Sequence, residues 1–347
     1  MKIPYYIGSY AGASEDSIYR YELDTEKEVF LRSWAYAGAE NPSYVLPHPD
    51  GKILYSVEEL SPEGRVCAFE ILPDGLRKVQ SVPSGGADPC HLSLDDQARF
   101  LFVSNYSSGS LAVFRLDENG MIVEMTDRKD HTGRSVYEIR QASAHVHFSK
   151  YSSNGILYSC DLGEDRVYAY RLDREKGILT QSGTQICVPE GFGPRHLVVD
   201  EEMKRLCVLT EMGAALIVCE EDGRIVQTLS ALPEGTDIES LESGAFRAVG
   251  AAIRMTEDGK YLMTSLRGHN SIAIFEKRED GSWKHCGVYP SGGRTPRDFF
   301  VLGDYVVAAN QDSDRVSLLR FDREKRTLCD TGTMEIVRIP VCIMPAL

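Results

Sequence analysis

One short pattern recurs seven times along the 347 residues of this chain. Each copy holds a nearly continuous apolar run, a short polar loop, a second run in which apolar and polar residues alternate, and a turn rich in Asp and Gly. The central positions of the first runs are Tyr6, Leu54, Leu101, Leu157, Leu206, Leu262 and Val306, at spacings of 48, 47, 56, 49, 56 and 44 residues. Repeats of this length are typical of β-propellers, in which each repeat forms one four-stranded blade.

The repeat predicts an all-β fold, a seven-bladed β-propeller with four-stranded antiparallel blades and a single domain over residues 1–347. We expect the first run of each copy to be a buried inner strand and the second run to be its half-exposed neighbour. The chain begins with the inner part of one copy and ends in another strand-like run, residues 336–343. Pairing of the N- and C-terminal strands in one blade would close the ring and remove the open sheet edges.

Charge and cysteine content narrow the functions open to such a fold. A net charge of −14 opposes binding to nucleic acid or to an anionic membrane surface, although a local arginine cluster can still hold one small anion. The N-terminus lacks the apolar core of a signal peptide, and no apolar run of ~18 residues occurs, so we expect a soluble cytoplasmic protein. The nine cysteines form no Cys-x-x-Cys pair, which indicates reduced core residues and no disulfide framework.

The first residue after each apolar run should lie at one mouth of the central channel. The seven residues at this place are Tyr10, Glu59, Tyr106, Leu162, Glu211, Arg267 and Gln311. A turn here would favour Gly, Asn or Asp, so Glu211 and Arg267 are the strongest candidates for chemistry.

A second ring of candidates lies on the lead-in segment before each apolar run. Ten residues before the central position stand Tyr44, His91, His147, His196 and Ala252, with Asp298 as the sixth member. Arg195, Arg297 and His145 are their direct neighbours in sequence. A single histidine here could simply bind a backbone carbonyl, but three histidines beside two arginines indicate a functional site.

Other chemistries find less support in the sequence. His145 and His147 share one strand face and could bind a cation, but no further ligand follows at a fixed offset and the nearby arginines would repel it. We therefore expect no metal. Neither a Gly-x-Ser-x-Gly elbow nor a His-Glu-x-x-His motif is present, which argues against common serine hydrolases and metalloproteases.

Several segments, in this order, resemble one known family: residues 90–95, 101–106, 145–147, 160–166, 193–196, 267–271, 295–299, 309–314 and 340–342. Together they resemble the seven-bladed-propeller lactonase family, which includes a bacterial 6-phosphogluconolactonase and a fungal carboxymuconate-lactonizing enzyme. The resemblance spans nearly the whole chain. It implies a catalytic set of His147, Arg195, Glu211 and Arg267, matching the His, two Arg and Glu proposed for the fungal enzyme. Thr210 and Leu266 depart from the family pattern, which usually has Asn at both places.

Opening a lactone requires a water molecule, a base and positive groups around the developing oxyanion. We expect Glu211 or His147 to activate the water, and Arg195 and Arg267 to stabilise the oxyanion or clamp an acid group of the substrate. The expected substrate-binding residues are His91, His145, His196, Arg297, Tyr106 and Gln311.

The resemblance implies a 6-phosphogluconolactonase of the pentose phosphate pathway that needs no cofactor and binds a small anionic lactone or sugar phosphate. Two alternatives remain open. The first is a lactonase or cycloisomerase for another carboxylated lactone, and the second is a non-catalytic propeller that only binds a ligand.

Overall fold

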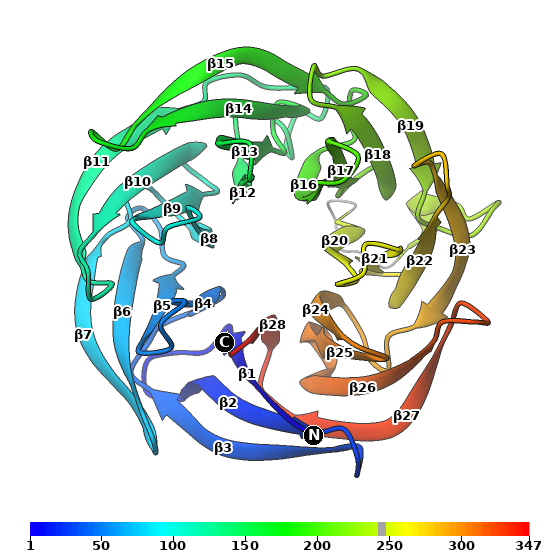
Figure 1. The fold of residues 1–347 in the computed structure, drawn as a ribbon, viewed down its shortest axis with the longest axis horizontal. Helices are drawn as coiled ribbons and strands as arrows, with labels where there is room; N and C mark the ends of the chain where they lie inside the picture. Colours follow the sequence, from blue (N-terminus) through cyan, green and yellow to red (C-terminus); the bar gives the residue numbers. More distant parts are fainter. Residues whose placement is uncertain (242–247, 347) are drawn as a thin grey trace.

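Seven sheets of four antiparallel strands stand around one axis and form a closed ring (Figure 1). The structure is a computed structural model, and it describes residues 1–241 and 248–346. In each sheet the strand nearest the axis comes from a lead-in segment, and the three strands that follow in the chain lie progressively further out. The seven-bladed, all-β prediction is confirmed.

The first blade contains β28 (Pro340–Pro345), β1 (Lys2–Ser9), β2 (Asp16–Asp24) and β3 (Val29–Ala37). The second contains β4 (Val45–Pro47), β5 (Ile53–Glu58), β6 (Arg65–Leu72) and β7 (Gly75–Pro83). The third contains β8 (Pro89–Leu94), β9 (Phe100–Asn105), β10 (Ser110–Leu116) and β11 (Ile122–Asp130). The fourth contains β12 (Val146–Tyr151), β13 (Ile156–Asp161), β14 (Arg166–Asp173) and β15 (Ile178–Cys187).

The fifth blade contains β16 (Pro194–Asp200), β17 (Arg205–Thr210), β18 (Ala215–Glu220) and β19 (Ile225–Ser230). The sixth contains β20 (Gly250–Met255), β21 (Tyr261–Leu266), β22 (Ser271–Lys277) and β23 (Trp283–Pro290). The seventh contains β24 (Pro296–Leu302), β25 (Tyr305–Asn310), β26 (Arg315–Asp322) and β27 (Thr327–Ile336). The helices of the described residues are two short 3-10 turns, η1 (Ile238–Ser240) and η2 (Gln311–Ser313), and none of them is long and apolar enough to cross a membrane.

The two ends of the chain close the ring, as predicted. β28 pairs antiparallel with β1, and Ile7 lies opposite Ile343. The approach of β1 to the second blade is close, because a Cβ atom on Gly8 would lie 2.4 Å from the carbonyl oxygen of Pro42. Glycine is therefore required at this position, and the closing blade is packed as tightly as the others.

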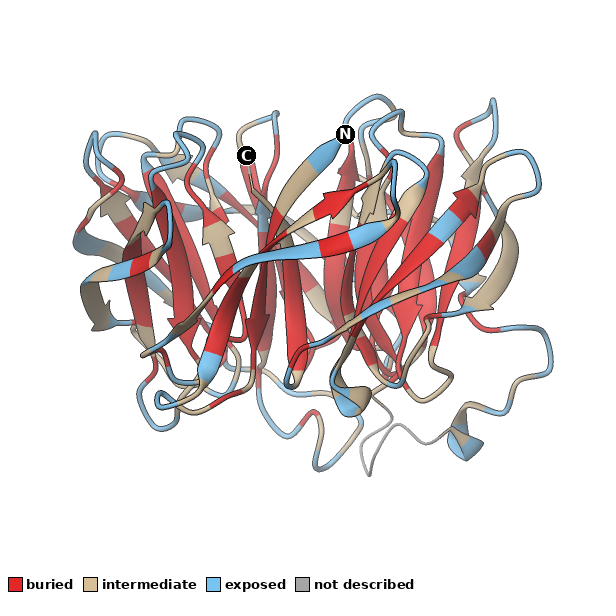
Figure 2. Cartoon of the chain, turned by 90° about the horizontal axis from the view of Figure 1, so that it is seen from below, coloured by how far each residue is buried: buried red, intermediate tan, exposed pale blue. Residues whose placement is uncertain are grey.

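The burial pattern corrects one expectation from the sequence. The first apolar run of each copy is the second strand from the axis and not the innermost one, and the lead-in segment lies inside it. Every residue of β5, β9 and β13 is buried because neighbouring blades cover both faces of these strands. The third strands were expected to be half exposed, yet β10 and β18 are almost fully buried for the same reason. Exposure is concentrated in the outermost strands and the connecting loops (Figure 2).

Ring closure makes a prediction about stability. Ile343 on β28 is fully buried, and Ile343→Ala should lower the free energy of unfolding by about 2–5 kcal/mol because it removes packed methyl groups and leaves a cavity. Ile336 at the end of β27 is 65% exposed, and Ile336→Ala should change it by less than about 0.5 kcal/mol. Urea unfolding followed by circular dichroism measures both. Equal losses would contradict a closing role for β28.

Candidate active site

The residues counted from the repeat do lie directly after the second strand of each blade. These strands end at Ser9, Glu58, Asn105, Asp161, Thr210, Leu266 and Asn310, and the next residues are Tyr10, Glu59, Tyr106, Leu162, Glu211, Arg267 and Gln311. Because the seven strands run in the same sense around the axis, these residues lie at one end of it, which we call the mouth.

The innermost strands add side chains through β-bulges. In β16, Pro194 pairs with Thr210 and His196 pairs with Leu209, so Arg195 has no partner across the ladder. Equivalent bulges leave Cys90, His147, Arg297 and Val341 unpaired. A bulge changes the direction of a side chain relative to a regular strand, and all five of these residues line one cavity at the mouth.

This register corrects the second ring predicted from the sequence. Counting ten residues back grouped His147 with His91 and His196, but the structural equivalents of His147 are Cys90, Arg195 and Arg297. Leu157 pairs with a residue six positions earlier, whereas Leu206 pairs with one seven positions earlier. The β12–β13 hairpin therefore has one residue fewer between its paired positions. Counting ten residues back from Leu157 consequently reaches the bulged residue His147, whereas the same count from Leu206 reaches His196, one residue after the bulged Arg195.

Glu211 is the centre of a cluster of arginines. Its carboxylate is 1% exposed and accepts hydrogen bonds from Arg195 Nε at 3.0 Å, from Arg267 at 2.7 Å and from Arg140. Burial alone would raise the pKa of this carboxyl, but the three guanidinium groups hold it well below its usual value. Glu211 is therefore ionised, and it holds three arginines in fixed positions around the mouth.

Arg140 was not identified from the sequence. It lies on the connection between β11 and β12, residues 131–145, which is longer than every other connection between blades except that between β19 and β20. Its guanidinium group bonds both Glu211 and the Tyr106 hydroxyl. Asp165 helps to hold this connection because it accepts a hydrogen bond from the Ser135 hydroxyl. Since Arg140 belongs to no repeated position, counting along the repeats could not have found it.

A second polar group lies on the other side of the mouth. Arg297 donates to the Tyr10 hydroxyl at 2.8 Å and to Gln311 Oε1 at 3.2 Å. Tyr10 in turn donates to both carboxylate oxygens of Glu59, at 2.8 and 2.9 Å, and the Ser43 hydroxyl also bonds Glu59. No described residue offers Arg297 a carboxylate within 4.0 Å, so its charge is not neutralised by an ion pair.

His147 lies between these two groups. It lines a cavity of about 20 Å³, enough for one water molecule, together with Arg195, Arg297 and Glu59. Its Nδ1 is buried without a hydrogen-bond partner among the described residues. Burial, and then the charge of Arg195, lowers the pKa of His147 well below its usual value, so the ring is neutral at pH 7.

The remaining predicted residues lie around His147 or beneath it. His145 stacks on Tyr106, with ring centroids 4.4 Å apart, and its Nδ1 is 3.1 Å from the Tyr106 carbonyl oxygen. His196 lines the cavity, and its Nε2 is 3.2 Å from Arg195. His91 packs deeper among Tyr44, Phe148 and His196 and does not line the cavity.

One group of the described residues has the composition of a metal site. His131, Asp161 and Glu164 bring their side-chain ligand atoms within 4.8 Å of one another. Each of these side chains already bonds protein atoms: His131 contacts Asp161 at 2.7 Å and Tyr170 at 2.8 Å, and Glu164 accepts from Tyr168 at 2.6 Å. This network anchors the start of the connection that carries Arg140.

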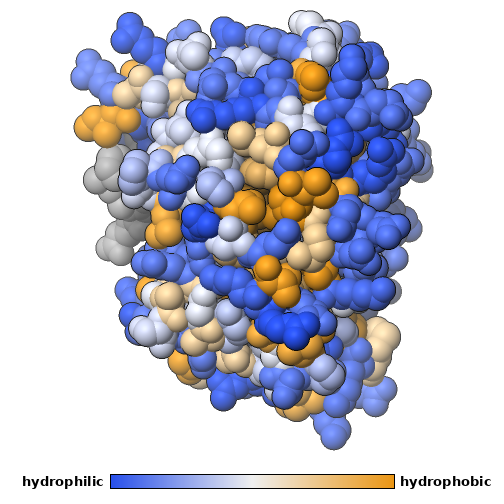
Figure 3. Space-filling view, turned by 90° about the vertical axis from the view of Figure 1, so that its left-hand side faces the viewer, coloured by the Kyte–Doolittle hydropathy of each residue, from blue (hydrophilic) through white to orange (hydrophobic). Residues whose placement is uncertain are grey.

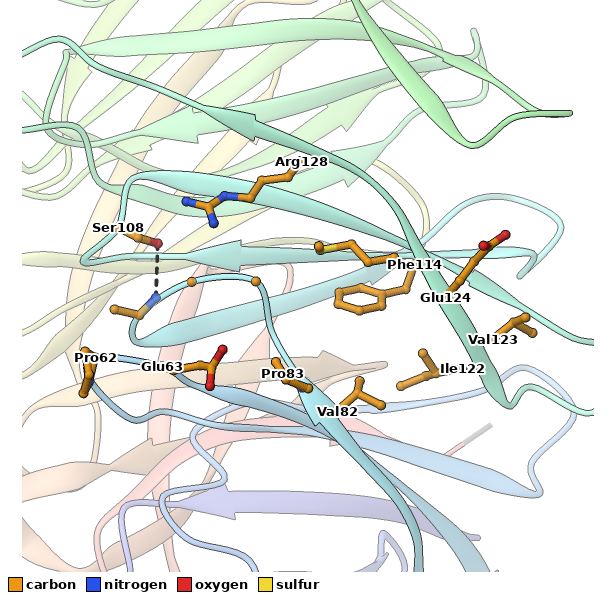
Figure 4. Close-up of a pocket in the computed structure, with 14 residues that line it drawn as sticks. Pro62, Glu63, Val82, Pro83, Ser108, Phe114, Ile122, Val123, Glu124 and Arg128 are labelled. Carbon is orange, nitrogen blue, oxygen red and sulfur yellow. Dashed lines mark hydrogen bonds between the residues drawn. The ribbon is translucent and has the colours of Figure 1, made fainter.

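A larger pocket lies away from the mouth, between the outer parts of the second and third blades. It has a volume of about 590 Å³, and Val82, Phe114, Ile122 and Met125 form its apolar wall (Figure 4). Apolar side chains also gather on this outer side of the ring (Figure 3). The charged group of Arg128 in its lining is already paired with Asp130 at 2.6 Å. Its lining includes two carboxylates, Glu63 and Glu124, and no histidine among the described residues.

Comparison with known proteins agrees with this geometry. The family model "Lactonase, 7-bladed beta-propeller" matches residues 4–345. A 6-phosphogluconolactonase of Bacillus subtilis is 32% identical over 350 residues, which cover 97% of each chain, and one of Formosa agariphila is 32% identical over 82% of each chain. A crystal structure from Bacteroides fragilis, named a "putative 6-phosphogluconolactonase", is 27% identical, with a TM-score of 0.89 over 99% of this chain and 98% of its own.

This chain therefore belongs to the lactonase family of seven-bladed β-propellers. It is an enzyme that hydrolyses lactones, which are carboxylic esters closed into a ring.

The Glu211 cluster predicts how stability depends on pH. Glu211→Gln leaves three arginines without their carboxylate and should lower the free energy of unfolding at pH 7 by about 3–5 kcal/mol. Because the pKa of Glu211 is lower in the folded state than its usual 4.5, this stabilisation is complete above pH 4.5 and is lost as the pH falls through the folded value. The difference between wild type and variant should shrink below pH 4.5.

Urea unfolding at pH 7 and pH 3.5 tests this. Glu63→Gln, the same change at an exposed position, serves as the control. A difference that is constant with pH would contradict the ionised state of Glu211.

Proposed function

We propose that the protein hydrolyses 6-phosphoglucono-lactone to 6-phosphogluconate at the mouth. The observation that carries this proposal is the excess of positive charge there in a protein of net charge −14. Among the described residues, Arg140, Arg195, Arg267 and Arg297 face three carboxylates, Glu59, Glu211 and Asp298, and Asp298 is already paired with Arg254. Arg297 is without an ion pair to any described residue. A phosphorylated lactone would supply the missing negative charge.

The surroundings of the two candidate bases favour His147 over Glu211. A carboxylate bound by three arginines has little affinity for a proton, so Glu211 is suited to positioning arginines. The neutral His147 ring lines a cavity large enough for one water, and its Nδ1 has no hydrogen-bond partner among the described residues. We therefore propose that His147 is the general base, which accepts a proton from the attacking water.

Arg195 and Arg297 are suited to different charges on the substrate. Arg195 is held by Glu211 and by the Ala251 carbonyl at 2.5 Å, and it lines the cavity beside His147. It would donate to the oxyanion that forms on the carbonyl oxygen. Arg297 would hold the phosphate, supported by Gln311, while Arg267 keeps Glu211 in place. Tyr106 and Arg140 would contact the sugar hydroxyls at the outer edge.

We also place this reaction in the cytoplasm, within the pentose phosphate pathway. All nine cysteines are described and free, and six of them are buried in the core. Such a set is typical of proteins that work in a reducing compartment.

Replacing His147 tests the assignment of the base. His147→Gln should lower kcat for 6-phosphogluconolactone by about 10²- to 10⁴-fold, with the Kd for 6-phosphogluconate changed only a few-fold. The pKa of His147 is lowered by burial, so the fall in wild-type kcat on the acid side should lie below pH 6.5. Both changes in kcat are measured from the rate at which freshly generated lactone opens, corrected for spontaneous hydrolysis. An unchanged kcat would remove His147 from the reaction.

Arg297 tests the identity of the acid group on the substrate. Arg297→Gln should raise KM for 6-phosphogluconolactone by about 10- to 100-fold and leave KM for unphosphorylated gluconolactone nearly unchanged. Arg294→Gln, an exposed arginine three residues earlier, is the matched control. Equal effects on both lactones would favour the alternative of a different, carboxylated substrate, and no opening of any lactone by the wild type would favour a binding protein.

A further inference from the structure

The mouth contains a second carboxylate that the proposed reaction has not yet used. Glu59 follows β5 in the second blade and occupies the position that Glu211 occupies in the fifth blade. Two blades lie between them on one side of the seven-membered ring and three on the other, so they lie on opposite sides of the mouth. Glu59 also lines the same small cavity as His147, Arg195 and Arg297.

The partners of the two carboxylates differ in kind. Glu211 is bound by three guanidinium groups, whereas the side-chain partners of Glu59 are the hydroxyls of Tyr10 and Ser43. Arg297 approaches Glu59 only through Tyr10, whose hydroxyl accepts from Arg297 and donates to Glu59. Hydroxyl groups can bond either the protonated or the ionised carboxyl, so this environment allows Glu59 to carry a proton.

Two carboxylates in one site whose environments differ in this way are suited to different tasks. Burial raises the pKa of Glu59, although Arg297, Ser43 and Tyr10 oppose this effect, while the pKa of Glu211 is lowered. The other charged or titratable groups that face Glu59 are Asp88 before β8, Cys90 on β8, and Tyr44, His196 and Asp298, which line the same cavity. His147 and Arg195 lie across the cavity.

We propose that Glu59 is the general acid of the reaction and protonates the ring oxygen as it leaves. This inference rests on the proposed lactonase mechanism with His147 as the base. The site would then present a proton acceptor and a proton donor at one cavity.

The oxygen of the attacking water bonds the carbonyl carbon while His147 takes one proton from that water. The negative charge is then on the carbonyl oxygen. When the carbonyl re-forms, the bond from carbon to ring oxygen breaks, and the ring oxygen takes the proton of Glu59 and becomes a hydroxyl. The new carboxylic acid releases its proton to solvent. The proton on His147 then returns to Glu59 through water, and both groups regain their starting states.

Glu59→Gln keeps the size of the side chain and one oxygen that can accept from Tyr10 and Ser43, but it cannot donate the proton. With 6-phosphogluconolactone, kcat should fall about 100-fold or more, and the Kd for 6-phosphogluconate should stay within about three-fold. The wild-type kcat should decline as the pH rises through the pKa of Glu59, which burial raises above its usual 4.5, and this decline should be absent in Glu59→Gln. A merely structural role for Glu59 would not change the pH profile. Glu63→Gln, an exposed glutamate of the same blade, should match the wild type.

The outcomes separate this inference from the function on which it rests. A wild type that does not open the lactone would overturn the proposed function itself. An active wild type with an equally active Glu59→Gln, or with a decline at rising pH that the variant retains, would overturn only the role of Glu59. If Glu59→Gln does not fold, Glu59→Asp replaces it. The aspartate should keep the decline at rising pH with a lower kcat, and an unchanged kcat would overturn the proposal.

Discussion

The antiparallel pairing of β28 with β1 is the contact on which the remaining structure depends. Each blade packs its apolar faces on two neighbours, so the arrangement of strands is complete only when the last blade meets the first. Closure also fixes where the strands end. Seven equivalent strand ends at one end of the axis then place side chains from distant parts of the sequence within contact of one another.

The site is built on this regular frame through local irregularities. A regular strand alternates its side chains, and the bulges of the inner strands break this alternation at Arg195, His147 and Arg297. The same backbone device thus presents an imidazole and two guanidinium groups from three blades toward one cavity. Glu211 then orders the arginines, because a single carboxylate cannot bind three guanidinium groups unless each approaches from a different direction.

Much of this arrangement could be predicted from the sequence, and the limits have physical causes. The repeat period determines the blade number, and counting from it located Glu211, Arg267, Tyr106 and Gln311, because strand ends recur at a constant place. The position of His147 within its ring could not be counted, since one shorter hairpin shifts the register without changing the apolar pattern. Arg140 belongs to a connection that no other blade repeats. The hydroxyl partners of Glu59 could not be foreseen either, because Tyr10 is 49 residues away in sequence and belongs to another blade.

The contact between Arg297 and Tyr10 joins residues 287 positions apart, across the place where the ring closes. The middle blades build the Glu211 side of the mouth from parts of the chain that are close in sequence. The Arg297 side instead needs β28 paired with β1, because only this pairing brings Tyr10 beside the seventh blade. Any weakening of the β28–β1 pairing therefore disturbs the Arg297 side of the mouth more directly than the Glu211 side.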